Sequence, residues 1–95
     1  MPDTANEIEE CRDAIDQIDS KIVNLLNERA GYANRIGELK KAVSLAVHQP
    51  EREEKVLGHV RSVNDGPLAS DSISRIFIQI IEESRRLEQK NADNE

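Results

Sequence analysis

The residues in this sequence best suited to chemistry are charged and hydroxyl side chains that interrupt otherwise apolar helical stripes. They are Arg29, Lys40, Arg52, Glu53, Ser84 and Glu88. Buried charges are costly unless they are paired or used by a ligand. Two arginines, a lysine and one or two carboxyl groups in one pocket would suit a small dianion that carries hydroxyl or ether oxygens. The sequence has no activated nucleophile pair and no glycine-rich phosphate loop, so an enzyme built on these residues would act by positioning and electrostatics.

Each of these residues also has a simpler interpretation. Taken alone, a charged residue in a helical seam more often keeps its charge in solvent or sets register than binds a ligand. Arg29 and Lys40, however, are eleven residues apart, which places them on one face of a helix at a separation of about 16 Å. Arg52 and Glu53 follow directly after the turn that begins the next helix. The set as a whole therefore favours an anion site over separate surface charges.

Composition and charge exclude several other classes of function. The chain has 95 residues, enough for one small domain, and a net charge of −6 with 2% aromatic residues argues against nucleic-acid binding. A single cysteine, Cys11, excludes an intrachain disulfide and a zinc site of several thiolates, and is expected to be a small core residue. His48 and His59 are expected on the surface and have no ligand spacing with Cys11, so no metal or other cofactor is predicted. Tyr32 is expected in packing. No secretion signal or membrane-length apolar run is present, which predicts a cytoplasmic protein.

The first predicted element is one very long helix over residues 5–44. Its apolar residues recur at alternating spacings of three and four, a heptad pattern, at Ile8, Cys11, Ile15, Ile18, Ile22, Leu25, Tyr32, Ile36, Leu39 and Val43. Such a helix would be about 60 Å long, which is too long for the rest of the chain to cover. The seam is therefore expected to pack on a second copy of the chain. Gly31 and Gly37 lie inside this helix, where they would permit close approach of another backbone.

Two shorter helices complete an all-α chain that forms a single domain over residues 1–95. The second helix, residues 49–64, has Pro50 in its first turn followed by three acidic residues, and it stops at a turn that contains Gly66. The third helix, residues 70–90, has Ser70 or Asp71 as its N-cap and carries a stripe of isoleucines. Residues 91–95 form a polar tail that is expected to fray. No segment shows the apolar alternation of a strand.

This order of motifs resembles the all-α, AroQ-type chorismate mutases. The resemblance covers about Ile8 to Glu88 and is carried by five segments. In chain order they are Cys11-Arg12-Asp13-Ala14-Ile15-Asp16-Gln17-Ile18-Asp19, Leu25-Leu26-Asn27-Glu28-Arg29, Ile36-Gly37-Glu38-Leu39-Lys40, Pro50-Glu51-Arg52-Glu53 and Ile80-Ile81-Glu82-Glu83-Ser84-Arg85-Arg86-Leu87-Glu88. Any one segment is weak, but all five in order at these separations are strongly specific.

The resemblance implies an intertwined homodimer of three-helix chains, with the long first helices packed together and two equivalent sites. It also implies the cofactor-free rearrangement of chorismate to prephenate, on the way to phenylalanine and tyrosine. Arg12 lies 17 residues before Arg29, about 25 Å along the same helix, so the two cannot serve one pocket in a single chain. In the family, the residue that matches Arg12 reaches into the site of the other subunit.

The same resemblance implies that basic residues bind the carboxylates of the substrate. Arg12 from the other subunit, Arg29 and Arg52 would hold the two carboxylates and set the conformation of the substrate, and Ser84 would assist at the ring carboxylate. Three residues would form apolar walls: Ile36, Val56 and Ile81.

The resemblance also implies which residues bind the ether oxygen and the ring hydroxyl of the substrate. The resemblance implies that Lys40 meets a carboxylate and the ether oxygen and that Glu53 accepts a hydrogen bond from the ring hydroxyl. Gln49 stands where many relatives have Asp, a change that a role for its backbone N–H would tolerate. Glu88 stands where many bacterial members have Gln, and a carboxyl group donates a hydrogen bond only when protonated. Glu88 is therefore predicted to be kept neutral by an apolar, substrate-filled setting; the alternative is a shifted helix end that draws Gln89 into the site.

Two rival functions and one further partner stay open. An isochorismate–pyruvate lyase shares the fold and resembles the segments around Ile15–Ile18 and Pro50-Glu51-Arg52, but Glu53, the hydroxyl acceptor expected of a mutase, argues against it. A non-catalytic helical interaction module would use the seam charges only to fix register. Exposed charges such as Arg85-Arg86 are compatible with docking of an active mutase on another shikimate-pathway enzyme, or with plain solvation.

Overall fold

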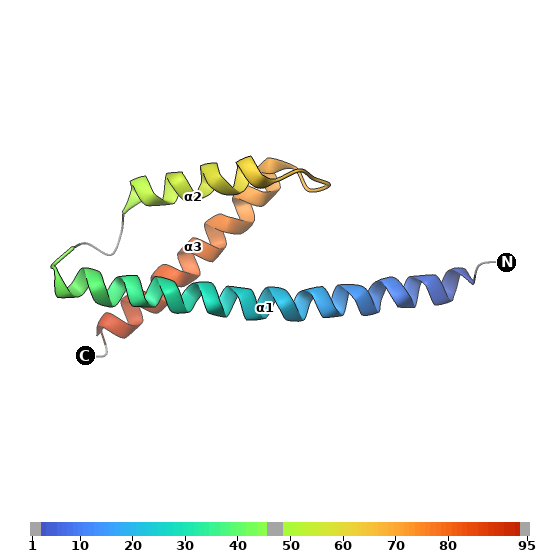
Figure 1. Cartoon of the computed structure of the whole chain (residues 1–95), viewed down its shortest axis with the longest axis horizontal. Coiled ribbons are helices and arrows are strands. Elements are labelled where there is room, and N and C mark those ends of the chain that lie inside the picture. The colour runs from blue at the N-terminus through green and yellow to red at the C-terminus, as the bar shows by residue number, and fades with distance from the viewer. Residues whose placement is uncertain (1–2, 46–48, 94–95) are drawn as a thin grey trace.

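The computed structural model of the chain describes residues 3–45 and 49–93, within which all regular structure is helical. Three helices follow one another: α1 is Thr4–Ala42, α2 is Pro50–Val63 and α3 is Ser70–Asp93. Figure 1 shows α1 as a long rod, with α3 crossing its C-terminal half. α3 packs against both α1 and α2, whereas the backbones of α1 and α2 stay apart within the described residues. The predicted all-α, three-helix fold class is confirmed.

α1 is not covered by the rest of this chain, as its length predicts. Its N-terminal half extends well beyond α2 and α3 (Figure 1), and the chain measures 65 Å along its longest axis. α1 has no buried residue, and Val60 of α2 is the one buried apolar side chain among the described residues. Cys11, predicted to be a core residue, is exposed in this chain. The exposed large apolar side chains of α1 are Ile8, Ile15, Ile18, Ile22, Val23, Leu25, Leu26, Tyr32, Ile36 and Leu39.

The C-terminus of α1 is set by a left-handed residue. Ser44 has a φ of 60°, a conformation that cannot continue a right-handed helix. The backbone N–H of Ser44 donates to the carbonyl of Lys41 at 3.2 Å, and that of Leu45 donates to the carbonyl of Lys40 at 2.8 Å. This pair of bonds is the Schellman motif, which satisfies carbonyls that the helix end would leave free. α1 therefore ends at Ala42, earlier than the predicted residue 44.

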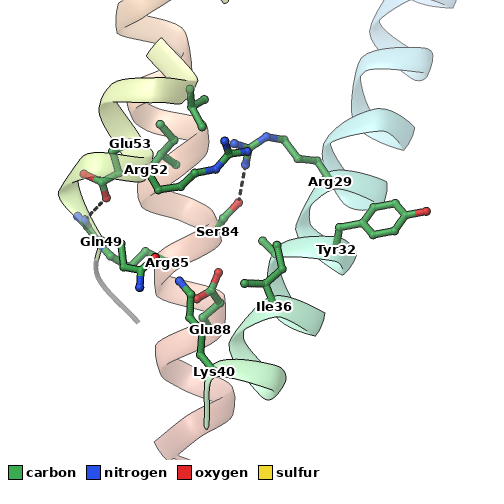
Figure 2. A pocket seen from close by; sticks show the side chains of 13 residues that line it. Arg29, Tyr32, Ile36, Lys40, Gln49, Arg52, Glu53, Ser84, Arg85 and Glu88 are labelled. Atoms are coloured by element: carbon green, nitrogen blue, oxygen red, sulfur yellow. Dashed lines mark hydrogen bonds and ion pairs between the residues drawn. The ribbon is translucent and has the colours of Figure 1, made fainter. Parts of the chain in front are cut away.

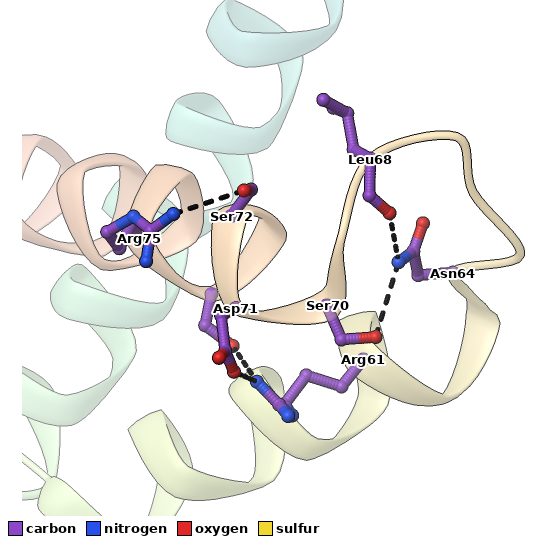
Figure 3. A network of polar contacts seen from close by, with 8 residues as sticks. Arg61, Asn64, Leu68, Ser70, Asp71, Ser72 and Arg75 are labelled. Atoms are coloured by element: carbon purple, nitrogen blue, oxygen red, sulfur yellow. Dashed lines mark hydrogen bonds and ion pairs between the residues drawn. The ribbon is translucent and has the colours of Figure 1, made fainter.

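A polar network at the corner between α2 and α3 fixes how these helices meet (Figure 3). The side-chain amide of Asn64 donates to the carbonyl of Leu68 at 2.8 Å and to the hydroxyl of Ser70 at 3.3 Å. Arg61, near the end of α2, donates to the carboxylate of Asp71, in the first turn of α3, at 2.9 Å. The helices diverge from this corner (Figure 1), so the first turn of α2 lies apart from the later turns of α3.

The other helix boundaries lie close to those predicted. Gln49 is the N-cap of α2 and Pro50 its first residue, which agrees with the helix-start signature. α3 continues to Asp93, so the predicted end at residue 90 is wrong, and the first part of the predicted frayed tail is helical. The amide of Asn91 donates to the side-chain oxygen of Asn34 on α1, which ties this last turn down. Residues 94 and 95, like His48, lie outside the described residues. Over the residues that the structure describes, no helix is both long enough and apolar enough to span a membrane.

Candidate active site

A cavity of about 230 Å³ opens between α1, the first turns of α2 and the later turns of α3 (Figure 2). Every residue predicted for the site from the sequence, except Arg12, lies on its wall. These residues are Arg29, Ile36, Lys40, Gln49, Arg52, Glu53, Val56, Ile81, Ser84 and Glu88. Each helix supplies one stripe at spacings of three and four, which is why residues far apart in the chain converge here.

The first turn of α2 presents neighbouring residues to the cavity from a fixed backbone. Pro50 occupies the first helical position, where its locked φ favours the helix and its missing N–H costs nothing. The backbone N–H groups of Arg52 and Glu53 both donate to the carbonyl of Gln49, at 3.1 and 3.3 Å. The side chain of Gln49 makes no capping hydrogen bond. This turn therefore places Arg52 and Glu53 next to each other at one edge of the cavity.

Arg29 and Arg52 bring two positive charges together inside the cavity. Figure 2 shows their guanidinium groups pointing toward one another from α1 and α2. Arg29 donates to the hydroxyl of Ser84 on α3 at 3.3 Å, and Ser84 is 9% exposed. Burial lowers the pKa of Arg29 below its usual value, and the charge of Arg52 lowers it further. Neither arginine forms an ion pair with a carboxylate among the described residues, so this part of the cavity favours an anion.

Glu53 is held by a residue of α3. Nη1 of Arg85 lies 2.7 Å from Oε1 of Glu53 in an ion pair that joins the two helices. The side chains of Arg85 and Glu53 are 38% and 29% exposed. The Glu53 carboxylate of α2 is therefore held by a guanidinium from α3.

Glu88 and Lys40 lie together at the far end of the cavity (Figure 2). Burial raises the pKa of the Glu88 carboxyl, and the charge of Lys40 opposes this effect in part. Glu88 packs on Gly37, where an added Cβ would lie 3.3 Å from Cγ of Glu88. The atoms nearest to an added Cβ at Gly37 belong to the Glu88 side chain and not to another backbone, which was the expectation for this glycine. An added Cβ at Gly31 would meet nothing within 4 Å in this chain.

Arg12 and Gln89 lie outside this cavity. Gln89, the alternative to Glu88, is exposed and does not line the wall. Arg12 lies on the exposed N-terminal half of α1, where it pairs with Glu9 of the preceding turn at 2.7 Å. Because 17 residues of helix separate Arg12 from Arg29, about 25 Å, Arg12 cannot reach the cavity of its own chain.

Three residues that line the cavity were not among those predicted for the site: Tyr32, Ala33 and Arg85. Tyr32 was expected in packing, but it is 69% exposed, and Figure 2 shows its ring pointing away from α2 and α3. Arg85 was considered an exposed charge. The signal that could have found it is helical periodicity, because Arg85 falls four residues after Ile81 and three before Glu88.

The charges on the cavity wall suit a small anion with additional polar oxygens. Four basic side chains line it, Arg29, Lys40, Arg52 and Arg85, against two carboxyl groups, Glu53 and Glu88. Among the described residues, no group of three or more histidines, cysteines and acids is placed to hold a metal ion. The wall offers hydrogen-bond donors to carboxylates, a carboxylate acceptor for a hydroxyl, and apolar side chains between them.

Comparisons with known proteins find relatives of this chain. Residues 11–89 match the protein family described as "Chorismate mutase type II". The chain is 47% identical to a "Bifunctional chorismate mutase/prephenate dehydratase" of Neisseria gonorrhoeae over 77 residues, which are 81% of this chain and 21% of that protein. It is 30% identical to a "Chorismate mutase" of Methanocaldococcus jannaschii over 82 residues, 85% of this chain and 83% of that one.

A solved structure shares the fold as well. The chorismate mutase of Thermus thermophilus, in its form II structure, superposes with a TM-score of 0.85 and 31% sequence identity over 87% of this chain and 94% of that chain. The chain spans about a fifth to a quarter of the length of the bifunctional relatives that it matches. The matched residues include the whole cavity, and the chain belongs to the type II chorismate mutase family.

Proposed function

We propose that this chain catalyses the rearrangement of chorismate to prephenate. The observation that carries the proposal is the pair of guanidinium groups of Arg29 and Arg52, which point toward one another in the cavity (Figure 2) and form no ion pair with a carboxylate among the described residues. A dicarboxylate substrate would supply the missing negative charge. The relatives named as chorismate mutases support the same assignment.

Restraint of the substrate is the first contribution of the site. Arg29 and Arg52 would hold the two carboxylates, and Ser84, which Arg29 already orients at 3.3 Å, would assist at the ring carboxylate. Held in this way, the flexible substrate keeps the compact conformation in which its reacting carbons lie close together. Because the conformational freedom of the substrate is already lost on binding, the activation barrier of the bound substrate is lower.

Stabilisation of the ether oxygen is the second contribution. As the ether C–O bond breaks, negative charge grows on that oxygen, and preorganised donors lower the barrier. Lys40 and Glu88 lie together at one end of the cavity and would both donate to it. Glu88 can donate only as the neutral acid, and burial raises its pKa in that direction. No proton needs to be transferred, because the donors only stabilise charge.

Recognition of the ring hydroxyl is assigned to Glu53. Its carboxylate lines the cavity and would be the acceptor that a ring hydroxyl needs. The same residue argues against the lyase alternative, as it does in the sequence.

A second copy of the chain would complete the site. The apolar seam of α1 is exposed along the N-terminal half, which gives it the surface for a homodimer of paired long helices. If two α1 helices pair in an antiparallel way about a two-fold axis near Ser20 and Lys21, Arg12 of one chain comes level with Arg29 of the other. This arrangement would add a third arginine to the carboxylate site and cover the seam.

The test is an assay of the purified chain that quantifies prephenate and pyruvate separately. Prephenate from chorismate without pyruvate is the expected result, lost in Arg29→Ala and kept in Arg35→Ala, whose arginine lies on the same helix outside the cavity and pairs with Glu38. Pyruvate from isochorismate with no prephenate from chorismate would establish the lyase instead. A folded dimer that turns over neither substrate would support the non-catalytic module.

A further inference from the structure

We propose that Arg85 is a positioning residue that holds the Glu53 carboxylate toward the ring hydroxyl of the substrate. This inference rests on the proposed function, in which Glu53 accepts a hydrogen bond from that hydroxyl. The site residues predicted from the sequence do not include Arg85, yet it lines the cavity and bonds to one of them. Arg85 would therefore act on the substrate indirectly, by orienting Glu53.

The Arg85–Glu53 contact differs from the other ion pairs of the described residues. Its length, 2.7 Å from Nη1 to Oε1, is the same as in two of the other pairs, but those two lie within one helix, whereas this one joins α3 to α2 across 32 residues of sequence. Its side chains are the least exposed of these pairs, at 38% and 29%, against 45% or more for every other member. Solvent therefore competes less with this bond than with the others, and a charge-assisted bond of this length fixes the orientation of the carboxylate.

Glu53 needs such a partner because of its surroundings. Arg52 precedes it in the chain, and Lys40 and Arg29 line the same cavity, so a flexible glutamate side chain has several cations to turn toward. A guanidinium fixed on α3 selects one orientation. A carboxylate offers about four lone-pair positions, so a bond from Arg85 is compatible with acceptance of a hydrogen bond from the substrate.

Arg85 also balances the charge of Glu53 against the substrate. A carboxylate on the wall repels a dianion at short range unless a cation lies beside it. The guanidinium of Arg85, 2.7 Å away, supplies that cation without occupying the carboxylate sites of Arg29 and Arg52. Glu53 can then select a hydroxyl without opposing the binding of the carboxylates.

The adjacent residue provides a matched control. Arg86 also makes a 2.7 Å ion pair, but with Glu83 on its own helix, and its side chain is 72% exposed. It does not line the cavity. Arg85→Ala and Arg86→Ala therefore each remove one guanidinium and one ion pair from α3, and only the first removes a contact to Glu53.

The experiment compares two substrates on the full chain. They are chorismate and a chorismate whose ring hydroxyl is methylated, which cannot donate a hydrogen bond to Glu53. The measured quantities are kcat and KM for wild type, Arg85→Ala, Arg85→Lys and Arg86→Ala, each checked by circular dichroism. We expect Arg85→Ala to lower kcat/KM for chorismate about tenfold and for the methyl ether less than about threefold, the size of one charge-assisted hydrogen bond. Arg85→Lys should recover part of the loss, and Arg86→Ala should match wild type on both substrates.

A second measurement tests the same role without Arg85→Ala, in case that variant is less stable than wild type. In a Glu53→Gln background, Arg85→Lys should cost less than it costs in the wild-type background, because the carboxylate that it orients is gone. Equal losses on both substrates, or equal costs in both backgrounds, would overturn the positioning role and leave the mutase assignment intact. Wild-type protein that does not convert chorismate would overturn the proposed function itself, and the role of Arg85 with it.

Discussion

Gly37 of α1 and Glu88 of α3 approach so closely that a Cβ on Gly37 would lie 3.3 Å from Cγ and 3.4 Å from Oε2 of Glu88. Glycine in the interior of a helix costs about 1 kcal/mol relative to alanine. At this position the missing side chain leaves room for the Glu88 carboxyl to reach the cavity beside Lys40. A local loss of helix stability thus accompanies the placement of a group that the proposed reaction needs.

Gly37→Ala should separate these two effects. The alanine favours the helix, so the free energy of unfolding should stay equal or rise by up to about 1 kcal/mol. The added methyl group must push Glu88 aside by a few tenths of an ångström, so kcat/KM should fall several-fold to about a hundredfold, because small misplacements of a donor are costly. Gly58→Ala in α2, where an added Cβ would meet nothing within 4 Å, should gain stability without losing activity. Equal activities in the two variants would contradict this account.

The protonation state of Glu88 should control the pH dependence of the reaction. Burial raises its pKa, and in the proposed mechanism the neutral acid is the form that would donate to the ether oxygen. Activity should therefore be highest below this pKa and decline as the pH rises through it. Glu88→Gln, whose amide donates at every pH, should remove this decline in the kcat profile. A wild-type profile that is flat from mildly acidic to mildly alkaline pH, and unchanged in Glu88→Gln, would exclude the role.

Glu88 should also leave a trace in stability. Because its folded-state pKa is raised above the unfolded value, the folded chain binds more protons between the two values. The contribution of Glu88 to stability is fully present below the unfolded pKa and is lost as the pH rises through the folded pKa. Denaturant unfolding of wild type and Glu88→Gln across this window should show the wild type losing stability relative to the variant. The opposite slope would mean that Lys40 outweighs burial at this site.

Arg52 is predicted to serve binding rather than stability. Its charge opposes that of Arg29, whose pKa it lowers, so Arg52→Gln should be no less stable than wild type. Its kcat/KM should nevertheless fall about ten- to a hundredfold or more, because hydrogen bonds to charged groups are worth about 1.5–3 kcal/mol. Lys55→Gln removes the same charge from an exposed position of α2 outside the cavity and is the control. Thermal unfolding and steady-state kinetics of both variants check this prediction. An Arg52→Gln variant that unfolds at a lower temperature than wild type would contradict it.

Periodicity in the sequence predicts the helices and the charged and hydroxyl residues of the cavity, because both depend on local spacing. Gln49 and the apolar wall residues were instead predicted from the family resemblance. The exposed seam of α1 follows from its length alone. Charged residues within apolar stripes pointed to the wall of the cavity, since each stripe marks the face that meets another helix. Ser44 escaped prediction because a left-handed helix end is usually formed by glycine, and no composition rule singles out this serine.

Arg85 required knowledge of how the helices cross. Its position on α3 is periodic with Ile81, but whether that edge faces solvent or α2 depends on how α3 crosses α2, which local spacing does not determine. Tyr32 is a residue for which helical periodicity predicted a contact that this chain does not make. Its seam position predicted packing, and it is exposed because the rest of this chain does not reach it. Relations between segments, and between copies of the chain, are the part that sequence spacing does not determine.

The proposed role of Arg12 across subunits of a homodimer can be tested by mixing two inactive variants. Arg12→Ala and Arg29→Ala should each lose most activity as pure dimers, because each lacks one carboxylate ligand in both sites. Reassembled from an equal mixture, half of the dimers are mixed, and each mixed dimer has one site with both arginines and one with neither. Activity should then recover to about a quarter of wild type. If Arg12 served its own chain, every site would still lack one arginine, and the mixture would be no more active than the average of the two variants.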